Sequence, residues 1–357
     1  MNRQLKNTFT CMAALIGICG ISANVSTAKD FSSYYDGEVI SAEKFNAVTK
    51  ALDEGVKHFG AQNGILVVMN PVDATILASY TTNKSSTANK ELYEAGSIMK
   101  TFDVAMGLES GKIKDDEEID TSKPLVIDGF TIKDRNEPYG IISPEEVLVK
   151  SSNIGAAKIA LKTGGEYQYD FFNKLGMLSK IDSYEIESAK PMFFGKEKWI
   201  STPKYIATAS YGYGISETPL HLITAYSALI NGGIYHKPSF EKINDKEGVR
   251  VISEDNSMLM RKYLRKVVTD GTAKRADSDK YYLMGKTGTA DKIKKDGKYD
   301  SESAITTFVG NFEHDGVSYA ILVILDDPQA SKETYGFKTA GWNAVPVTKN
   351  IIEELIK

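Results

Sequence analysis

The sequence predicts an α+β fold, in which one antiparallel sheet is formed from both ends of the domain and is flanked by helices. Three observations support this prediction. Apolar, β-branched runs occur near both ends of the chain, patterns with a helical period fill the middle, and 42% of the 357 residues are hydrophobic while 25% are charged. These proportions are those of an ordinary globular protein, and they exclude a disordered or fibrous chain.

The first half of the chain alternates between helix and strand patterns. Residues 42–59 predict an amphipathic helix, because Val48, Leu52 and neighbouring apolar residues share one face. Residues 64–70 and 74–80 are apolar runs separated by a Pro/Asp turn, which predicts a hairpin. A helix is expected to begin at Ser97 and to end by Gly111, a residue type that commonly follows a helix.

The second half contains further helices and then a return to strands. Strands here are rich in β-branched and aromatic residues, whereas the helices carry apolar residues at a period near 3.6. The expected helices span residues 144–150, 153–162 and 219–230, the expected strands span 281–284, 306–312 and 317–325, and a last helix spans 346–356.

Residues 1–28 predict a signal peptide or a signal anchor. Arg3 and Lys6 precede an uncharged apolar stretch, and small residues around Ser26 offer a cleavage point. The strongly apolar part is shorter than the roughly 20 residues that span a bilayer, which favours cleavage over anchoring. We therefore expect the protein to be exported, to the periplasm or to the outer face of the cytoplasmic membrane.

Charge and composition exclude several function classes. The formal net charge is −4, so no basic excess is present to bind nucleic acid. Both cysteines, Cys11 and Cys19, lie in the leader, so we expect neither a disulfide nor a thiolate nucleophile. The four histidines lack the spacing of metal ligands, and we expect no metal and no organic cofactor. They are His58, His221, His236 and His314.

A nucleophile must then come from Ser, Thr, Lys or a carboxylate, and Ser97-Ile-Met-Lys100 offers a pair. Positions i and i+3 share a helix face, so the Ser97 hydroxyl and the Lys100 amine can touch. Ser-x-x-Lys also begins at Ser26, Ser41, Ser201 and Ser239, and roughly two or three such matches are expected by chance in an average composition. Only the match at Ser97 combines a preceding glycine turn with a following apolar helix.

Two more segments carry groups that suit acyl transfer. Ser151-Ser-Asn153 stands directly before an apolar helix, and Lys286-Thr-Gly-Thr289 directly follows an apolar run. Taken alone, the first is more typical of helix capping and the second of a turn after a strand, just as Ser97 alone is more typical of a cap. On a strand edge, however, Gly288 would let a substrate backbone approach closely.

Their order changes this interpretation. Ser-x-x-Lys, Ser-x-Asn and Lys-Thr-Gly, separated by 54 and then 135 residues, resemble the active-site motifs of the penicillin-binding proteins and serine β-lactamases. The short-then-long spacing is similar to that of the transpeptidase domain of class B penicillin-binding proteins. Further segments resemble family landmarks in family order: 93–100, 108–112, 211–214, 218–220, 231–233, 271–273 and 285–290.

The resemblance implies a transpeptidase-like α+β fold with an all-helical subdomain, and it implies roles for the motif residues. Ser97 would attack the carbonyl between the last two D-alanines of a peptidoglycan stem peptide, with Lys100 as base. Ser151 would relay the proton, and Asn153 would orient Lys100 and the substrate amide. Lys286, Thr287 and Thr289, around Gly288, would bind the terminal carboxylate, and the N–H groups of Ser97 and Thr289 would form the oxyanion hole.

The resemblance also implies domains and partners. We expect a leader at 1–28, a short segment with an amphipathic helix at 29–61, and the transpeptidase domain at 62–357. The family usually carries a large pedestal domain where only residues 30–61 stand here. Ala95 stands where the family often has a proline, and Asp291 stands where a glutamine is commoner. The expected partners are peptidoglycan stem peptides, β-lactams as inhibitors and a membrane glycosyltransferase, with no nucleic acid.

Three alternatives stay open at this point. The chain resembles the serine β-lactamases as well, although Asn153 occupies a position where one class of them prefers an apolar residue. A D-alanyl-D-alanine carboxypeptidase would use the same groups with water as the acceptor. A penicillin sensor or a non-catalytic scaffold would keep the fold without the reaction.

Overall fold

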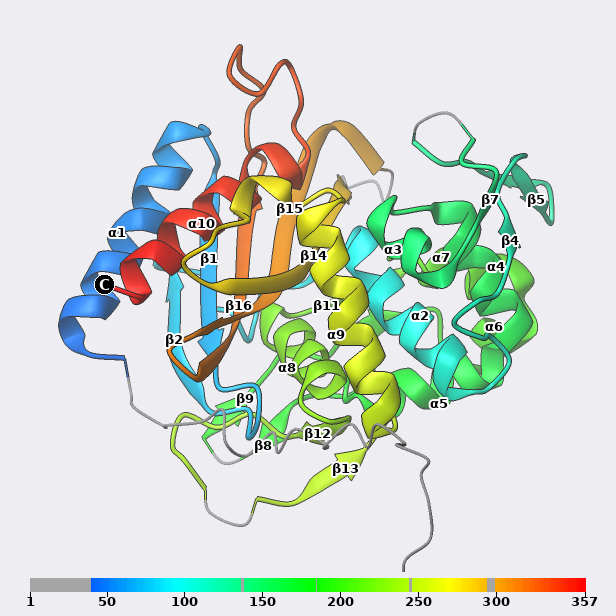
Figure 1. The fold of residues 1–357 in the computed structure, drawn as a ribbon, viewed down its shortest axis with the longest axis horizontal. Coiled ribbons are helices and arrows are strands. Elements are labelled where there is room, and N and C mark those ends of the chain that lie inside the picture. The colour runs from blue at the N-terminus through cyan, green and yellow to red at the C-terminus, as the bar shows by residue number, and fades with distance from the viewer. Residues whose placement is uncertain (1–39, 136–137, 184, 244–245, 294–298) are drawn as a thin grey trace, which may run out of the picture. The chain divides into compact units, whose positions relative to one another are not determined.

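The computed structural model describes residues 40–135, 138–183, 185–243, 246–293 and 299–357 (Figure 1). The leader predicted at 1–28 lies outside these ranges, as does the start of the segment predicted at 29–61. Within the described ranges, no helix is both long enough and apolar enough to cross a membrane.

A five-stranded antiparallel sheet joins the two ends of the chain. Its strand order is β14-β15-β16-β1-β2, so the hairpin β1–β2 pairs through β1 with the last strand of the C-terminal meander. All seven residues of β1 are buried, because the sheet is covered on both faces at its centre. The prediction of one sheet built from both ends is confirmed. The strands are β1 Asn63–Met69, β2 Ile76–Thr81, β14 Tyr282–Ile293, β15 Tyr299–His314 and β16 Val317–Asp326.

Helices from both ends of the chain pack on the sheet. Helix α1 (Ala42–His58) contacts β1 and α10 (Ala344–Leu355), and Figure 1 shows these two helices side by side on the face of the sheet turned to the viewer. Ser41 caps α1, as its hydroxyl accepts a hydrogen bond from the Lys44 N–H. Valine 347 fills the space beside Gly55, where a Cβ would lie 2.6 Å from a Val347 methyl group. This contact explains the small residue in the middle of α1.

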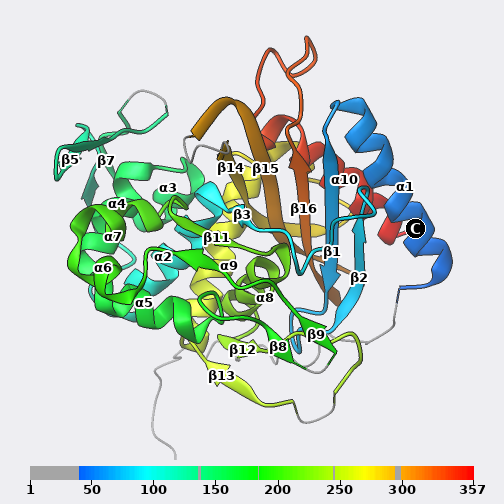
Figure 2. The same cartoon turned by 180° about the vertical axis from the view of Figure 1, so that it is seen from behind.

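The remaining helices form a second layer beside the sheet. Helix α8 is buried along all twelve residues and contacts β1, β15 and β16, while α9 packs against β14. Figure 2 shows α2, α4, α5, α6 and α7 grouped on the side of β14. These helices are α2 Met99–Glu109, α3 Pro144–Val149, α4 Asn153–Thr163, α5 Gly165–Lys174, α6 Lys196–Ser201, α7 Pro203–Ala209, α8 Pro219–Ile230 and α9 Glu254–Thr269.

The helical part also carries short strand pairs that the sequence did not signal. They connect helices and pair as β4–β7, β5–β6, β8–β9, β12–β13 and the three-stranded β10-β11-β3. Their bounds are β3 Tyr93–Glu94, β4 Ile119–Asp120, β5 Leu125–Ile127, β6 Phe130–Ile132, β7 Ile141–Ile142, β8 Asp182–Ser183, β9 Ile186–Glu187, β10 Met192–Phe193, β11 Ile215–Glu217, β12 Ile234–His236 and β13 Gly248–Arg250. The subdomain predicted as all-helical is therefore helical with small β additions.

Candidate active site

Ser97 lies at the junction between the helical layer and the sheet. It occupies a 3-10 turn, Gly96–Ile98, that continues directly into α2, a helix whose first ten residues are buried. Gly96 has a φ of +54°, and a Cβ at this position would lie 2.7 Å from the Thr289 carbonyl oxygen. Only glycine accepts both this backbone conformation and this contact. The turn is thereby pressed against β14, the strand that carries the Lys-Thr-Gly-Thr segment.

Lys100 is fully buried, and its side-chain amine lies beside the Ser97 hydroxyl. Its Nζ is 2.7 Å from Ser97 Oγ, 2.8 Å from the Ser151 carbonyl oxygen and 3.2 Å from Ser151 Oγ. Burial lowers the pKa of Lys100 well below its ordinary value, and the positive charge of Lys286 lowers it further. A neutral amine in this place can accept the proton of the Ser97 hydroxyl.

Ser151 places its hydroxyl between the two buried lysines. Lys286 Nζ donates to Ser151 Oγ at 3.0 Å. Lys100 Nζ, which belongs to the Ser-x-x-Lys motif, contacts the same oxygen. Ser151 has a φ of +58°, a conformation that is uncommon for a residue with a side chain and that is found more often at functional sites. The helix cap that the sequence equally suggested falls on Ser152, whose Oγ accepts the Gly155 N–H, so Ser151 is not the capping residue.

Lys286 is as deeply buried as Lys100. Besides Ser151, its Nζ donates to the Thr287 carbonyl oxygen at 3.1 Å. Burial lowers the pKa of Lys286 to about 7. Near neutral pH this lysine is therefore balanced between its charged and neutral forms, and a nearby anion favours the charged form.

The first residue of α4, Asn153, faces the same cavity but does not contact Lys100 through any hydrogen bond found in the described residues. Its side-chain Nδ2 donates to the Lys133 carbonyl oxygen at 3.0 Å. Its expected role in orienting Lys100 stays a prediction. Asp134 holds this segment in place, accepting hydrogen bonds from the backbone N–H of Asn153 at 2.5 Å and of Ile154 at 3.1 Å, and from Ser152 Oγ at 2.9 Å.

Asp134 was missed by the sequence reasoning. It lies about 20 residues before the segment that it caps, outside any local capping pattern. Its negative charge also opposes, in part, the lowering of the Lys100 pKa. The sequence signal for Asp134 is indirect. The first N–H groups of a helix lack partners within the helix, so an acidic residue earlier in the chain is a candidate to accept them.

The Lys-Thr-Gly-Thr segment lies within β14, which continues to Ile293 and forms one outer strand of the sheet. Thr287 and Thr289 point to the same side because they are two residues apart. Thr287 Oγ1 is 2.5 Å from Thr272 Oγ1, and Thr289 Oγ1 accepts the Ala340 N–H at 3.2 Å. Gly288 packs so closely on the segment around Ser97 that a Cβ would lie 2.5 Å from the Ala95 carbonyl oxygen.

A cavity of about 410 Å³ opens at this point. Five of the eight residues singled out in the sequence line it, namely Ser97, Ser151, Asn153, Thr287 and Thr289. Lys100 and Lys286 are hydrogen-bonded to the lining serines from behind, and Gly288 lies in the strand between the two threonines. Among the described residues, no three His, Cys, Asp or Glu side chains gather as a metal site. The arrangement brings a serine hydroxyl together with two buried lysine amines beside one cavity.

Comparison with known proteins agrees with this geometry. Residues 64–353 match the family model described as the penicillin binding protein transpeptidase domain. The chain is 30% identical over 334 residues to the probable peptidoglycan D,D-transpeptidase FtsI of Caulobacter vibrioides, covering 87% of this chain and 56% of that protein. It is 28% identical over 301 residues to the peptidoglycan D,D-transpeptidase FtsI of Escherichia coli, covering 80% and 50%. The chain thus spans about half the length of these curated relatives.

Solved structures give the same result for the fold. The apo transpeptidase domain of penicillin-binding protein 3 from Burkholderia pseudomallei superposes with a TM-score of 0.80 at 27% identity. The match covers 89% of this chain and 95% of that domain.

Proposed function

The chain belongs to the penicillin-binding protein transpeptidase family, and from this membership we propose that it is a peptidoglycan D,D-transpeptidase that works through a serine acyl-enzyme. One observation carries the proposal. The Ser97 hydroxyl lies 2.7 Å from the amine of a fully buried lysine, and Ser97 lines a cavity together with Ser151, Thr287 and Thr289.

The first half-reaction acylates Ser97. Lys100 in its neutral form removes the hydroxyl proton as Oγ attacks the carbonyl between two D-alanines of a stem peptide, and the terminal D-alanine leaves as an amine. Ser151 contacts both lysines and is placed to pass the proton to that amine. The N–H groups of Ser97 and Thr289 would stabilise the oxyanion, a contribution on the order of 10²–10³ in rate for each donor.

In this proposal, Lys286, Thr287 and Thr289 bind the terminal carboxylate. The buried ammonium group supplies charge, and the two hydroxyls supply hydrogen bonds from an outer strand that a substrate can approach. A carboxylate here would also favour the protonated form of Lys286. The second half-reaction transfers the acyl group to an amine of a neighbouring stem peptide, and a β-lactam would enter by the same route to leave a slowly hydrolysed ester.

The site acts on a substrate that lies outside the cytoplasm, so the proposal includes export of the chain by the leader predicted at 1–28. It also includes the domain bounds expected from the sequence, with the transpeptidase domain at 62–357. A membrane glycosyltransferase that supplies new glycan strands is the partner that such an activity would need.

Labelling with a fluorescent penicillin tests the proposal. Wild-type protein should form a long-lived covalent adduct, Ser97→Ala should form none, and Lys100→Ala should acylate far more slowly because the base is lost. Glu43→Gln, on the exposed first turn of α1, is the matched control that should label normally. Labelling that persists in Ser97→Ala would overturn the assignment of the nucleophile.

Two further readouts separate the alternatives. Rapid turnover of nitrocefin would identify a β-lactamase, whereas stoichiometric acylation supports a transpeptidase. Mass spectrometry of products from a synthetic muropeptide distinguishes cross-linked dimers from the hydrolysed tetrapeptide of a carboxypeptidase. A non-catalytic scaffold would let Ser97→Ala complement a deletion strain.

A further inference from the structure

Two threonine hydroxyls from different parts of the chain meet at the wall of the cavity. Thr287 lies on β14, whereas Thr272 lies on the connection between α9 and β14. Both residues line the cavity, and their Oγ1 atoms are 2.5 Å apart, which is a hydrogen bond. The mechanism above uses Thr287 but gives no role to Thr272.

The backbone of Thr272 is fixed on both sides. The N–H groups of its two neighbours, Gly271 and Ala273, donate to the same acceptor, the Val267 carbonyl oxygen, at 3.1 and 3.2 Å. Gly341 approaches from the other side, so closely that a Cβ there would lie 2.7 Å from the Thr272 carbonyl oxygen. Thr272 is thereby held between α9 and the segment that contains Gly341.

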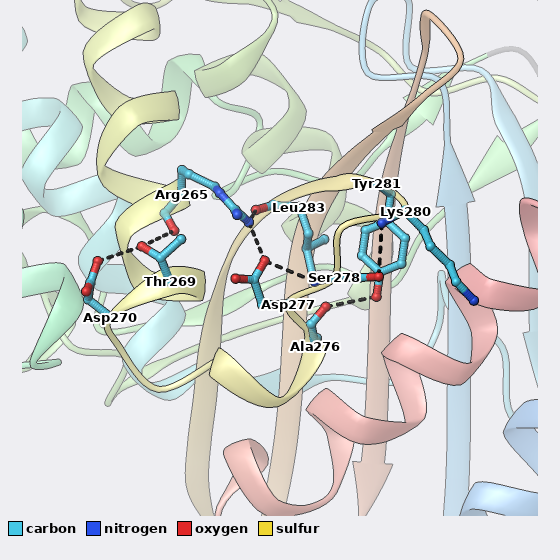
Figure 3. A network of polar contacts seen from close by, with 9 residues as sticks. All are labelled: Arg265, Thr269, Asp270, Ala276, Asp277, Ser278, Lys280, Tyr281 and Leu283. Carbon is cyan, nitrogen blue, oxygen red and sulfur yellow. Dashed lines mark hydrogen bonds and ion pairs between the residues drawn. The ribbon is translucent and has the colours of Figure 1, made fainter.

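Figure 3 shows that the rest of this connection is fixed as well. Arg265 Nη1 donates to Asp277 Oδ1 and to the Leu283 carbonyl oxygen, both at 2.8 Å. Tyr281 Oη donates to the Ala276 carbonyl oxygen at 2.8 Å. The connection is therefore tied to the helix before it and to the strand after it. A side chain on such a backbone can hold a neighbouring hydroxyl in one direction.

The other threonine of the motif, Thr289, has an orienting partner of its own. Its Oγ1 accepts the Ala340 N–H at 3.2 Å. This contact uses a lone pair of the Thr289 oxygen and leaves its proton for another acceptor. Among the described residues, no N–H group donates to Thr287 Oγ1, and the Thr272 hydroxyl is its one hydrogen-bond partner.

The arrival of a carboxylate decides which hydroxyl of the pair donates. In the free protein either oxygen can be the donor. An ionised carboxylate only accepts, so Thr287 must donate to one that binds beside Lys286. Thr272 must then donate to Thr287. Hydrogen bonds in such a chain polarise one another, so the first strengthens the second.

We propose that Thr272 is a positioning residue for substrate binding, and that its hydroxyl turns the Thr287 proton into the cavity toward a carboxylate. This inference rests on the proposed transpeptidase function and concerns its binding of the terminal carboxylate. Thr272 acts through Thr287, without contact to the substrate. In its absence the Thr287 hydroxyl can rotate among its staggered positions, only some of which point to the carboxylate.

The test compares two acyl donors that differ in one group. They are the N-acyl-D-alanine thioesters of thioglycolate and of thioglycolamide, whose leaving groups end in a carboxylate and in a neutral amide. The rate of thiol release by the purified full chain gives kcat/KM for each donor. The ratio of the two values is the carboxylate preference. Because both donors transfer the same acyl group to Ser97, changes in the reactivity of Ser97 or Lys100 cancel in this ratio.

Single variants measure the contribution of the Thr272 hydroxyl. Thr272→Val, which keeps the shape but loses the hydroxyl, should lower the carboxylate preference about fivefold, as expected for one hydrogen bond. Thr272→Ser keeps a hydroxyl and should restore most of the preference. Thr269→Val is the matched control, because the Thr269 hydroxyl donates to Asp270 Oδ2 at 2.6 Å and Thr269 is not among the residues that line the cavity. Its preference should equal that of the wild type.

A double variant tests whether Thr272 acts through Thr287. Thr287→Val alone should lower the preference about tenfold, the effect of losing a hydrogen bond to a charged group. Adding Thr272→Val to it should change nothing more, since the hydroxyl that Thr272 orients is already gone. A double variant with a lower preference than Thr287→Val would show that Thr272 binds the carboxylate itself, and it would overturn the positioning role.

The remaining outcomes are also decisive. An unchanged preference in Thr272→Val, or an equal loss in Thr272→Val and Thr272→Ser, would refute the inference while the proposed function stands. If neither the thioesters nor penicillin acylates Ser97, then the transpeptidase function is wrong, and the inference is wrong with it.

Discussion

Replacing Lys286 with methionine should stabilise the fold while it abolishes carboxylate binding. The side chain is fully buried, and burial lowers its pKa from the ordinary 10.5 to about 7. At about 1.4 kcal/mol for each tenfold change in the protonation equilibrium, the charged form costs about 5 kcal/mol in the folded protein. The variant avoids this cost, but it also loses the Lys286 hydrogen bonds to Ser151 and to the Thr287 carbonyl, which reduces the gain in stability by about 1–3 kcal/mol.

The pH dependence has a definite sign. Between the folded pKa of about 7 and the unfolded value near 10.4, the unfolded chain holds a proton on this lysine that the folded protein has released. Stability of the wild type therefore rises with pH in this window, and the contribution levels off below pH 7, where both states are protonated. From pH 7 to pH 9 the rise amounts to about 2 kcal/mol, which Lys286→Met lacks.

Urea unfolding of the wild type and Lys286→Met at pH 6, 7, 8 and 9 measures this effect. The variant should be more stable at pH 6 and 7, and its advantage should shrink by about 2 kcal/mol by pH 9. Removal of Lys286 also relieves the repulsion that lowers the pKa of Lys100. The stability of the variant therefore rises less with pH, and this also makes its advantage over the wild type smaller at high pH. Stability curves that run parallel with pH would refute the reasoning, because they would mean that Lys286 keeps its ordinary pKa.

Gly96→Ala should destabilise the fold by about 1–3 kcal/mol and slow acylation, because its Cβ would lie 2.7 Å from the Thr289 carbonyl oxygen. Gly111→Ala is the control, since Gly111 also has a positive φ but faces open space. It should reduce the free energy of urea unfolding by less and leave acylation unchanged. Asp134→Ala should cost about 1–2 kcal/mol, as expected for loss of a helix cap, and should lower the penicillin acylation rate; an unchanged rate would contradict its part in placing the Ser-x-Asn segment. Burial raises the pKa of Glu217 well above its ordinary value. Above the pKa of the unfolded chain, the wild type therefore loses stability as pH rises, because the unfolded chain releases a proton that the folded protein retains. Glu217→Gln removes this loss, so it should raise the melting temperature at pH 8 but hardly at pH 5. An equal change at both pH values would show that ionisation of Glu217 is not the cause.

Much of the sheet could be predicted from the sequence because its strands are continuous apolar runs. The hairpin at 64–80 and the strands at 306–312 and 317–325 correspond to β1, β2, β15 and β16. Strand β14 was predicted only to residue 284, since its continuation is polar and glycine-rich, and pairing with β15 decides its conformation. The short helices α6 and α7, separated at Thr202, carry too few residues to show a period.

Within the site, the sequence alone supports only the local pair. Spacing predicts that the Ser97 and Lys100 side chains touch, and the 2.7 Å contact confirms it. The helix itself begins later than predicted, at Met99, because Ser97 lies in the 3-10 turn before it. That Ser151 and Lys286 join them followed from the resemblance of the motif order, because no local pattern brings together residues 54 and 135 positions apart. A second Lys-Thr-Gly sequence, Lys162-Thr-Gly164, lies at the C-terminal end of α4, where Gly164 is the residue that follows the helix.

The nearly complete burial of α2 has a consequence for the lifetime of the catalytic geometry. Ten of its eleven residues are buried, and the helix leads out of the turn that carries Ser97. Amide hydrogens in such an element exchange with solvent only when most of the molecule opens, not through local fraying. We therefore expect hydrogen–deuterium exchange to rank Met99–Leu108 among the slowest segments, and heat to abolish acylation at the same temperature at which the whole domain melts.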